Sequence, residues 1–231
     1  MFNSFMKKMA KRISMAVLAL AALLAFAACG NNNEAPAGAD ENQIQTQDRT
    51  AAAGQGPVRG VWDDNVFTSD YLGFTFNMPA SWVVATDAEL QGIMELGAAV
   101  IGEGAGITED MWDAIGLTVF TDFMASNPLT GANVSLLYER LVFPATRMTA
   151  EDYIQVASEQ MAELGWPLTI IPGTTRIGNY DWHSYSIVID LMGIRMYNRT
   201  FLNIHDGFVR MIQITYSSMS ESWEEILNMF D

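Results

Sequence analysis

Alternating apolar and polar positions recur in short runs along most of this chain and predict β-strands. Successive side chains of a strand point to opposite faces, so a run in which every second residue is apolar is typical of a strand with one buried face. Turns of hairpin length separate most neighbouring runs, and such turns join antiparallel strands. The predicted strands lie at residues 66–70, 73–78, 117–125, 132–142, 168–177, 181–190, 194–203 and 208–217.

Three segments outside these runs begin like helices, with Thr or Ser followed three residues later by an acid. These pairs are Thr86 with Glu89, Thr149 with Asp152, and Ser222 with Glu225. In the middle helix the apolar stripe is Tyr153, Ala157, Met161 and Leu164. A further short helix is expected at 108–115. The pattern therefore predicts one α+β domain over residues 59–231, a single antiparallel sheet flanked by helices.

The first 58 residues have a different texture. Four basic residues precede position 13, and residues 15–28 are apolar and uncharged, which is typical of a secretion signal too short to span a membrane. The run ends at Cys29, the single cysteine, and Phe26-Ala27-Ala28-Cys29 resembles the lipobox of bacterial lipoproteins. This implies a signal peptide at 1–28, a lipidated Cys29 with a flexible linker over 29–58, and the domain at 59–231. The alternative is an ordinary signal peptide with an incidental cysteine.

Charge narrows the possible partners. After cleavage before Cys29, eight arginines and no lysine would face all 27 acidic residues of the 231-residue chain. Such a surface repels phosphate backbones and anionic lipid headgroups, so we expect no nucleic-acid partner and no membrane docking by charge. Acyl chains on Cys29 would supply the membrane attachment instead, at the extracytoplasmic face.

The same composition excludes several classes of enzyme. Without lysine, the mature chain cannot form a Schiff base, complete a P-loop or supply the lysine of an S-x-x-K hydrolase. A lipidated Cys29 leaves no thiol nucleophile and no cysteine metal site. His183 and Ser184 point to opposite faces of a strand, and His205 with Asp206 falls in a predicted turn. We therefore assign no catalytic residue and no cofactor.

Few imidazole or thiol side chains of this chain are potential metal ligands. The two histidines, His183 and His205, do not form an H-E-x-x-H pattern. Asp63-Asp64-Asn65 offers oxygen ligands for calcium but lacks the spacing of a calcium loop, and a solvated acidic turn is the preferred interpretation. No metal site is assigned.

The stretch from Val66 to Trp82 resembles the opening of PsbP-like domains. It has an aromatic strand, a Gly-Phe hairpin and a Pro-x-x-Trp segment, over 17 residues. Members of this family include an extrinsic subunit of photosystem II and many bacterial lipoproteins. The resemblance implies an α/β/α sandwich and the role of a non-catalytic accessory subunit.

The last two hairpins predict a candidate binding face. With two-residue turns at Met192-Gly193 and Asp206-Gly207, one side of three strands combines aromatic residues with arginines, which dominate binding hot spots. The candidate binding face consists of Trp182, Tyr197, Arg199, Phe201, Arg210 and Tyr216. The alternative is that the final helix covers this face and that each arginine pairs with a carboxylate, as Asp190 would with Arg195.

We therefore predict a lipid-anchored, extracytoplasmic binding or accessory module without catalytic activity. Its partner would be a protein or a small anionic ligand that binds the candidate binding face. The alternative is a secreted hydrolase with an acidic active site, for which Glu139 with a second carboxylate is one possible pair.

Overall fold

The computed structural model describes residues 56–231, except 91, 93–118, 142–144, 164 and 192–193. The predicted signal peptide, Cys29, the predicted linker up to residue 55 and the helix expected at 108–115 lie outside the described residues. Among the described residues, no helix is long and apolar enough to cross a membrane.

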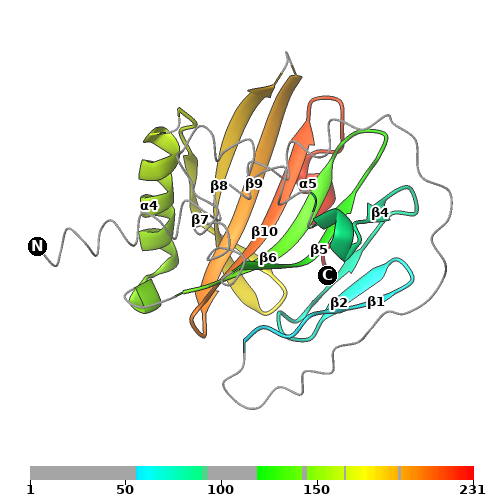
Figure 1. Cartoon of the computed structure of the whole chain (residues 1–231), viewed down its shortest axis with the longest axis horizontal. Coiled ribbons are helices and arrows are strands. Elements are labelled where there is room, and N and C mark those ends of the chain that lie inside the picture. The colour runs from blue at the N-terminus through cyan, green and yellow to red at the C-terminus, as the bar shows by residue number, and fades with distance from the viewer. Residues whose placement is uncertain (1–55, 91, 93–118, 142–144, 164, 192–193) are drawn as a thin grey trace, which may run out of the picture.

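A large antiparallel sheet carries most of the predicted strands (Figure 1). Its order, β4-β5-β6-β10-β9-β8-β7, shows that the strands from β7 to β10 follow one another as hairpins. Six of its seven described strands correspond to runs predicted from the sequence, and one short strand at 83–84 was not predicted. The strands are β4 (Val83–Val84), β5 (Val119–Ser126), β6 (Asn133–Arg140), β7 (Thr169–Ile177), β8 (Tyr180–Leu191), β9 (Ile194–His205) and β10 (Phe208–Ser217).

The first strands form a second, smaller sheet of β1 (Val61–Asp63), β2 (Val66–Ser69) and β3 (Phe74–Asn77). The prediction of a single sheet was therefore wrong in this respect. After β3 the chain turns at 78–82, and β4 pairs with β5 of the large sheet instead of continuing the small one. Alternation identifies a strand but does not identify its neighbour, which is why the sequence did not separate the two sheets.

Two helices have predicted caps, and one short 3-10 turn precedes the first of them: η1 (Ala145–Arg147), α4 (Ala150–Glu163) and α5 (Trp223–Leu227). At α4, the Thr149 hydroxyl accepts from the amide of Asp152 at 3.1 Å, and the Asp152 carboxylate accepts from the amide of Thr149 at 3.1 Å. Ser222 and Glu225 form the same reciprocal pair at α5. The cap at Thr86 is also formed, although its helix is described only at 87–90 and 92.

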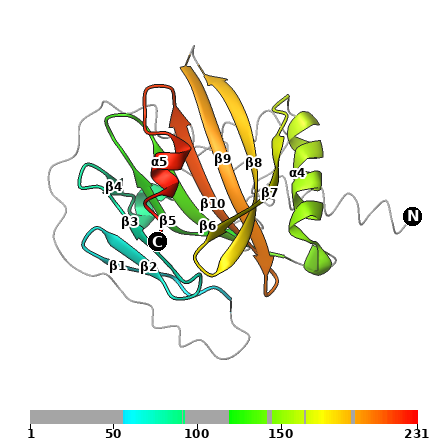
Figure 2. The ribbon, with the colours of Figure 1, turned by 180° about the vertical axis from the view of Figure 1, so that it is seen from behind.

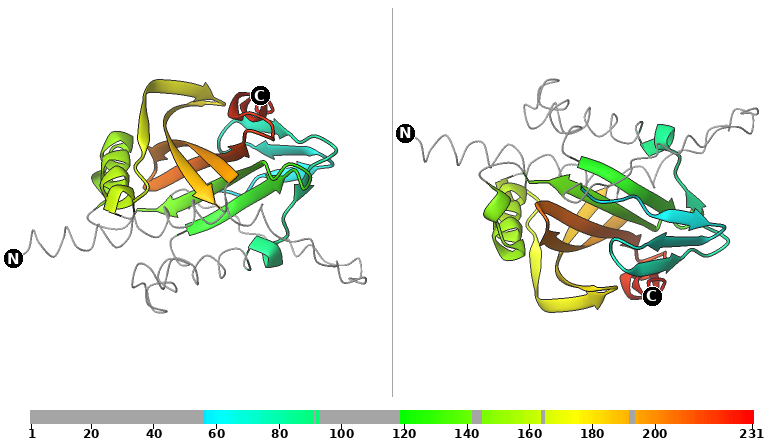
Figure 3. Two further views of the ribbon diagram at one scale, coloured as in Figure 1. Left: turned by 90° about the horizontal axis from the view of Figure 1, so that it is seen from above. Right: turned by 90° about the horizontal axis from the view of Figure 1, so that it is seen from below.

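The large sheet separates two apolar clusters. On one face, Tyr153, Ala157 and Met161 of α4 pack against β8, β9 and β10. On the other, the small sheet and α5 pack against the large sheet, and Figure 2 shows α5 lying across it near β10. Figure 3 shows α4 and the small sheet on opposite sides of the molecule. The face opposite α4 is therefore covered by a sheet and a short helix. The sandwich expected from the sequence has only helices on that face.

Candidate functional site

The candidate binding face lies on one side of β8, β9 and β10, as the predicted turns require. Asp190 pairs with Arg195 across β8 and β9, and His205 with Phe208 across β9 and β10. In this register Tyr197 lies opposite Tyr216, so residues from neighbouring strands meet on one face. The shared face was thus predictable from the hairpin turns alone.

Burial divides this face into two parts. The side chains of Trp182, Phe201 and Arg210 are 0% exposed and belong to the core under the small sheet. Tyr197, Arg199 and Tyr216 are partly exposed. Solvent therefore reaches only these three residues of the predicted face, and we call them the outer part.

Arg199 occupies the centre of the outer part. Its guanidinium carbon lies 4.7 Å from the ring centre of Trp223 and 5.5 Å from that of Phe201. Its Nη2 donates to the Ser184 hydroxyl at 3.1 Å. Burial lowers the pKa of Arg199, and the neighbouring Tyr216 and Glu224 act in the opposite direction. The rings thus hold the guanidinium in place at the surface.

Two stacked tyrosines border Arg199. The rings of Tyr197 and Tyr216 lie 5.2 Å apart with an angle of 19° between their planes. Burial raises the pKa of Tyr216, so its hydroxyl stays protonated and can donate a hydrogen bond at neutral pH. Aromatic rings and a guanidinium together offer a flat surface with polar edges, which is typical of a contact surface.

The alternative interpretation of this face is confirmed only in part. The final helix does cover it, because Trp223 lies over Arg199 and Ile226 is buried in the same cluster. Arg195 also pairs with Asp190, at 2.9 Å. However, no carboxylate among the described residues lies within ion-pair distance of Arg199 or Arg210.

Two buried carboxyl groups stand apart from this face. Glu139 on β6 accepts a hydrogen bond of 2.6 Å from the Tyr153 hydroxyl of α4, and burial raises the pKa of Glu139 to about 8. Asp122 accepts from the amide of Gly60 at 3.2 and 3.3 Å, and burial raises its pKa to about 6. Both acids already have donors supplied by the fold.

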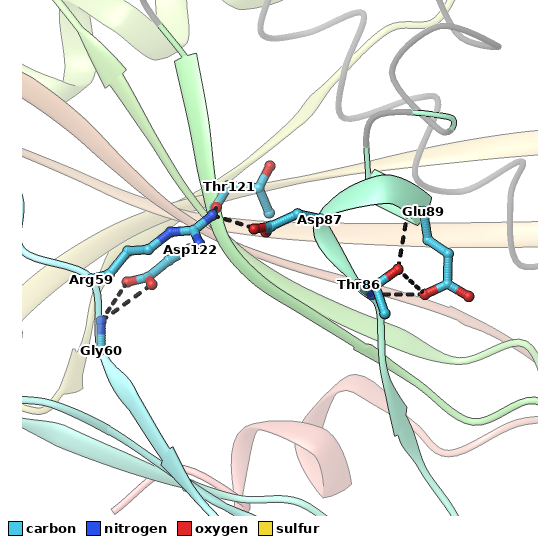
Figure 4. Close-up of polar contacts among 7 residues, drawn as sticks. All are labelled: Arg59, Gly60, Thr86, Asp87, Glu89, Thr121 and Asp122. Carbon is cyan, nitrogen blue, oxygen red and sulfur yellow. Dashed lines mark hydrogen bonds and ion pairs between the residues drawn. The ribbon is translucent and has the colours of Figure 1, made fainter. Parts of the chain in front are cut away.

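Sequence reasoning missed Asp122. The side chain is buried because the pairing of β5 with β6 shifts between Thr121 and Phe123, and Asp122 is the extra residue. In Figure 4 Asp122 faces Gly60, while Arg59 reaches the carbonyl of Thr121 at 3.1 Å. No local sequence signal marks such a bulge, since it depends on the partner strand.

The remaining predicted residues are scattered. His183 lies 3.3 Å from a carboxylate oxygen of Glu151 on α4, on the opposite side of the strand from Ser184, which contacts Arg199. His205 contacts Asp206 at 3.3 Å in the β9–β10 turn. Asp63 and Asp64 fall at the β1–β2 turn. Within the described ranges, no group of three or more His, Cys, Asp or Glu residues is arranged to hold a metal ion.

Among known proteins, solved structures of low sequence identity are similar to this chain. No family model matches this chain, and no curated protein matches its sequence. The chain is similar to a solved structure from Bacteroides thetaiotaomicron VPI-5482, with 12% identity, a TM-score of 0.34, and coverage of 69% of this chain and 44% of that one. It thus spans less than half of that protein.

A second similar structure is the cyanobacterial PsbP (CyanoP) from Synechocystis sp. PCC 6803. The identity is 10%, the TM-score is 0.37, and the match covers 78% of this chain and 96% of that one. A PsbP protein is therefore among the solved structures to which this chain is similar.

Proposed function

We propose that this protein is an extracytoplasmic lipoprotein with a PsbP-like domain that acts as a non-catalytic binding or accessory module. The signal pattern before Cys29 supports secretion and lipid anchoring, and the linker that follows would hold the domain away from the membrane. The partner is a protein of the cell envelope that contacts the outer part of the candidate binding face.

The surroundings of Arg199 carry this proposal. Its guanidinium is partly exposed, lies against Trp223 and has no carboxylate partner among the described residues, although the chain is strongly acidic. A charge held in one position between rings loses little conformational entropy on binding. The adjacent Val188 is 47% exposed opposite Tyr197, which adds apolar area to the same surface. A partner carboxylate could pair with Arg199 while its apolar atoms contact the rings.

The experiment isolates the lipidated protein from its own membranes after mild crosslinking and identifies what is bound by mass spectrometry. We expect a stoichiometric partner with the wild-type protein. We expect that partner to be lost with the double variant Tyr197→Ala, Arg199→Ala, while the thermal midpoint stays close to that of the wild type. Retention of the partner by this variant, or a large loss of stability without any change in binding, would contradict the proposal.

Two matched variants complete this experiment. Arg195→Ala removes an exposed arginine that is already paired with Asp190, so it should retain the partner. Cys29→Ser removes the site of lipidation and should move the protein from the membrane to the soluble fraction. A Cys29→Ser protein that stayed membrane-bound would show that lipid on this residue is not the anchor.

A hydrolase with an acidic active site remains the alternative. Its best candidates would be Asp122 and Glu139, because both have a raised pKa. Yet Asp122 contacts Tyr138 on the side of the small sheet, whereas Glu139 contacts Tyr153 on the side of α4. The two acids lie on opposite faces of the large sheet, so they do not form the carboxylate pair that such hydrolysis uses.

A further inference from the structure

Arg210 is the most deeply buried charged side chain of the candidate binding face. It lies on β10 and is 0% exposed. The rings of Tyr71 and Tyr180 both lie over its guanidinium, with centres 4.3 and 4.4 Å from its central carbon. Its Nη2 donates to the Tyr71 hydroxyl at 2.7 Å. The aromatic rings therefore cover the guanidinium, and further hydrogen bonds are possible only in its plane.

The in-plane donors of Arg210 are not used by the protein. Its Nε and Nη1 are buried and have no acceptor. The guanidinium of Arg210 is a cation, so this site holds one positive charge. A buried charge without an anion destabilises the folded state, because its desolvation is not compensated, and native structures usually supply a partner. Here the described part of the chain supplies neither a carboxylate nor an oxygen for these two nitrogens.

Asn203 provides a second, independent sign of a ligand. It is the direct partner of Arg210 on the neighbouring strand β9, on the same face of the sheet. Its side chain is 7% exposed, and both its Nδ2 and its Oδ1 lack a hydrogen-bond partner. Side chains of directly opposed residues lie within about 5.5 Å of each other. Unused donors from two strands therefore lie side by side.

We propose that Arg210 and Asn203 bind the carboxylate group of a small organic acid. The guanidinium N–H groups and the Asn203 amide would donate to the two carboxylate oxygens, in the plane of the guanidinium that the tyrosine rings do not cover. A monovalent carboxylate balances the single charge of Arg210, whereas a phosphate dianion would leave a buried negative charge. The proposal does not depend on the surface around Arg199 or on a protein partner.

The two tyrosines also indicate the route by which a ligand would approach Arg210. Tyr71 belongs to the turn between β2 and β3, and Tyr180 begins β8 just after the turn at 178–179. Both are partly exposed while Arg210 is not, so a ligand that approached the guanidinium from solvent would pass these rings. The apolar part of the acid would contact the rings. The charge of the nearby Asp206, which acts on Tyr71, opposes the approach of an anion.

The experiment titrates the full-length protein in detergent with sodium acetate, sodium propionate and sodium phosphate, against sodium chloride at the same ionic strength. The thermal midpoint and the Nε–Hε signals of ¹⁵N-labelled arginine are followed. We expect both acids, but not chloride, to raise the midpoint with saturation and to shift one Nε–Hε signal. That signal should be missing from Arg210→Met.

Three variants separate binding from structure. Arg210→Met removes the unpaired charge, so it should be at least as stable as the ligand-free wild type and insensitive to acetate. Asn203→Leu keeps Arg210 but removes the amide, and should weaken acetate binding about tenfold, the effect of one lost hydrogen bond to a charged group. Asp206→Asn should bind acetate more tightly than the wild type.

Four results would overturn the proposal. The first is a wild-type protein whose midpoint and Nε–Hε signals do not respond to acetate or propionate. The second is an equal acetate response in Arg210→Met, which would place binding elsewhere. The third is an Arg210→Met variant that unfolds readily while the wild type ignores acetate, which would assign Arg210 a purely structural role. The fourth is a response to phosphate but not to either acid, which would exclude a carboxylate ligand.

Discussion

At the scale of single residues, burial decides the chemistry of this protein. Glu139 is 1% exposed and accepts a hydrogen bond from the Tyr153 hydroxyl. That single bond does not compensate for the loss of water, so the pKa of Glu139 rises from 4.5 to about 8. At neutral pH the folded protein therefore favours a neutral Glu139, which joins α4 to β6.

This shift predicts how stability depends on pH. A carboxyl group whose pKa is higher in the folded than in the unfolded chain stabilises the fold fully below its unfolded pKa. That contribution is lost as pH rises through the folded pKa. For Glu139 the window runs from 4.5 to about 8. Across this window, the free energy of unfolding of the wild type should fall by about 4 kcal/mol more than that of Glu139→Gln.

Urea unfolding of both proteins at about pH 5 and about pH 9 measures this difference. Asp122 also loses stabilisation as pH rises through its pKa of about 6, but it is present in both proteins and cancels in the comparison. If the two proteins lost equal stability between these pH values, Glu139 would not be the group that titrates.

At the scale of elements, two turns far apart in the sequence fit against each other. The amide of Asn179, in the β7–β8 turn, donates to the carbonyl of Leu72 at 3.1 Å, in the β2–β3 turn. Gly178 has φ +56°, and a Cβ there would lie 2.7 Å from the Leu72 oxygen and 2.8 Å from the Gly73 oxygen. These turns also carry Tyr71 and Tyr180 to the Arg210 guanidinium.

Gly178→Ala should therefore strongly destabilise the protein. It combines the strain of a side chain at positive φ with two backbone overlaps that no side-chain rotation relieves. We expect the free energy of unfolding to fall by more than about 2 kcal/mol, as measured by urea denaturation.

Gly207→Ala is the matched control for this substitution. Gly207 lies in the β9–β10 turn at φ +77°, but a Cβ there would meet nothing within 4 Å. It should lose only the conformational strain, about 1 kcal/mol. Equal losses in the two variants would mean that the contact between the two turns contributes nothing.

At the scale of the whole molecule, the last residues of the chain pair with β3, a strand near the start of the domain. The amide of Thr75 on β3 donates to the carbonyl of Asp231, and the amide of Asp231 donates to the carbonyl of Thr75, both at 2.9 Å. The ring of Phe230 lies 5.1 Å from that of Phe74 and 4.9 Å from that of Phe76. The C-terminal residues thus extend the small sheet beyond β3.

Phe230→Ala tests how much this closure contributes. We expect the free energy of unfolding to fall by about 2 kcal/mol, because the substitution removes two aromatic contacts at a half-buried site. Leu129→Ala is the comparison, since Leu129 is 87% exposed and should change stability by less than about 0.5 kcal/mol. Thermal unfolding of both variants measures the difference, and similar midpoints would contradict a role for the C-terminus in holding the small sheet.

The sequence by itself determined eight of the ten described strands, the helix caps and the side of the sheet on which the residues of the last two hairpins lie. Ser222 finds Glu225 three residues later, and Tyr197 comes to face Tyr216 because turn length sets the register. These features depend on residues close together in the chain or joined by one hairpin, so local patterns are sufficient to predict them.

Only the tertiary structure decided which residues of the candidate binding face are accessible. Arg199 and Arg210 have the same place in the alternation, yet one is partly exposed and the other is 0% exposed. Arg210 is buried under Tyr71, which lies 139 positions away in the chain, and the second sheet that carries Tyr71 was not predicted. Burial depends on contacts between distant segments, and the alternation within a single strand contains no information about them.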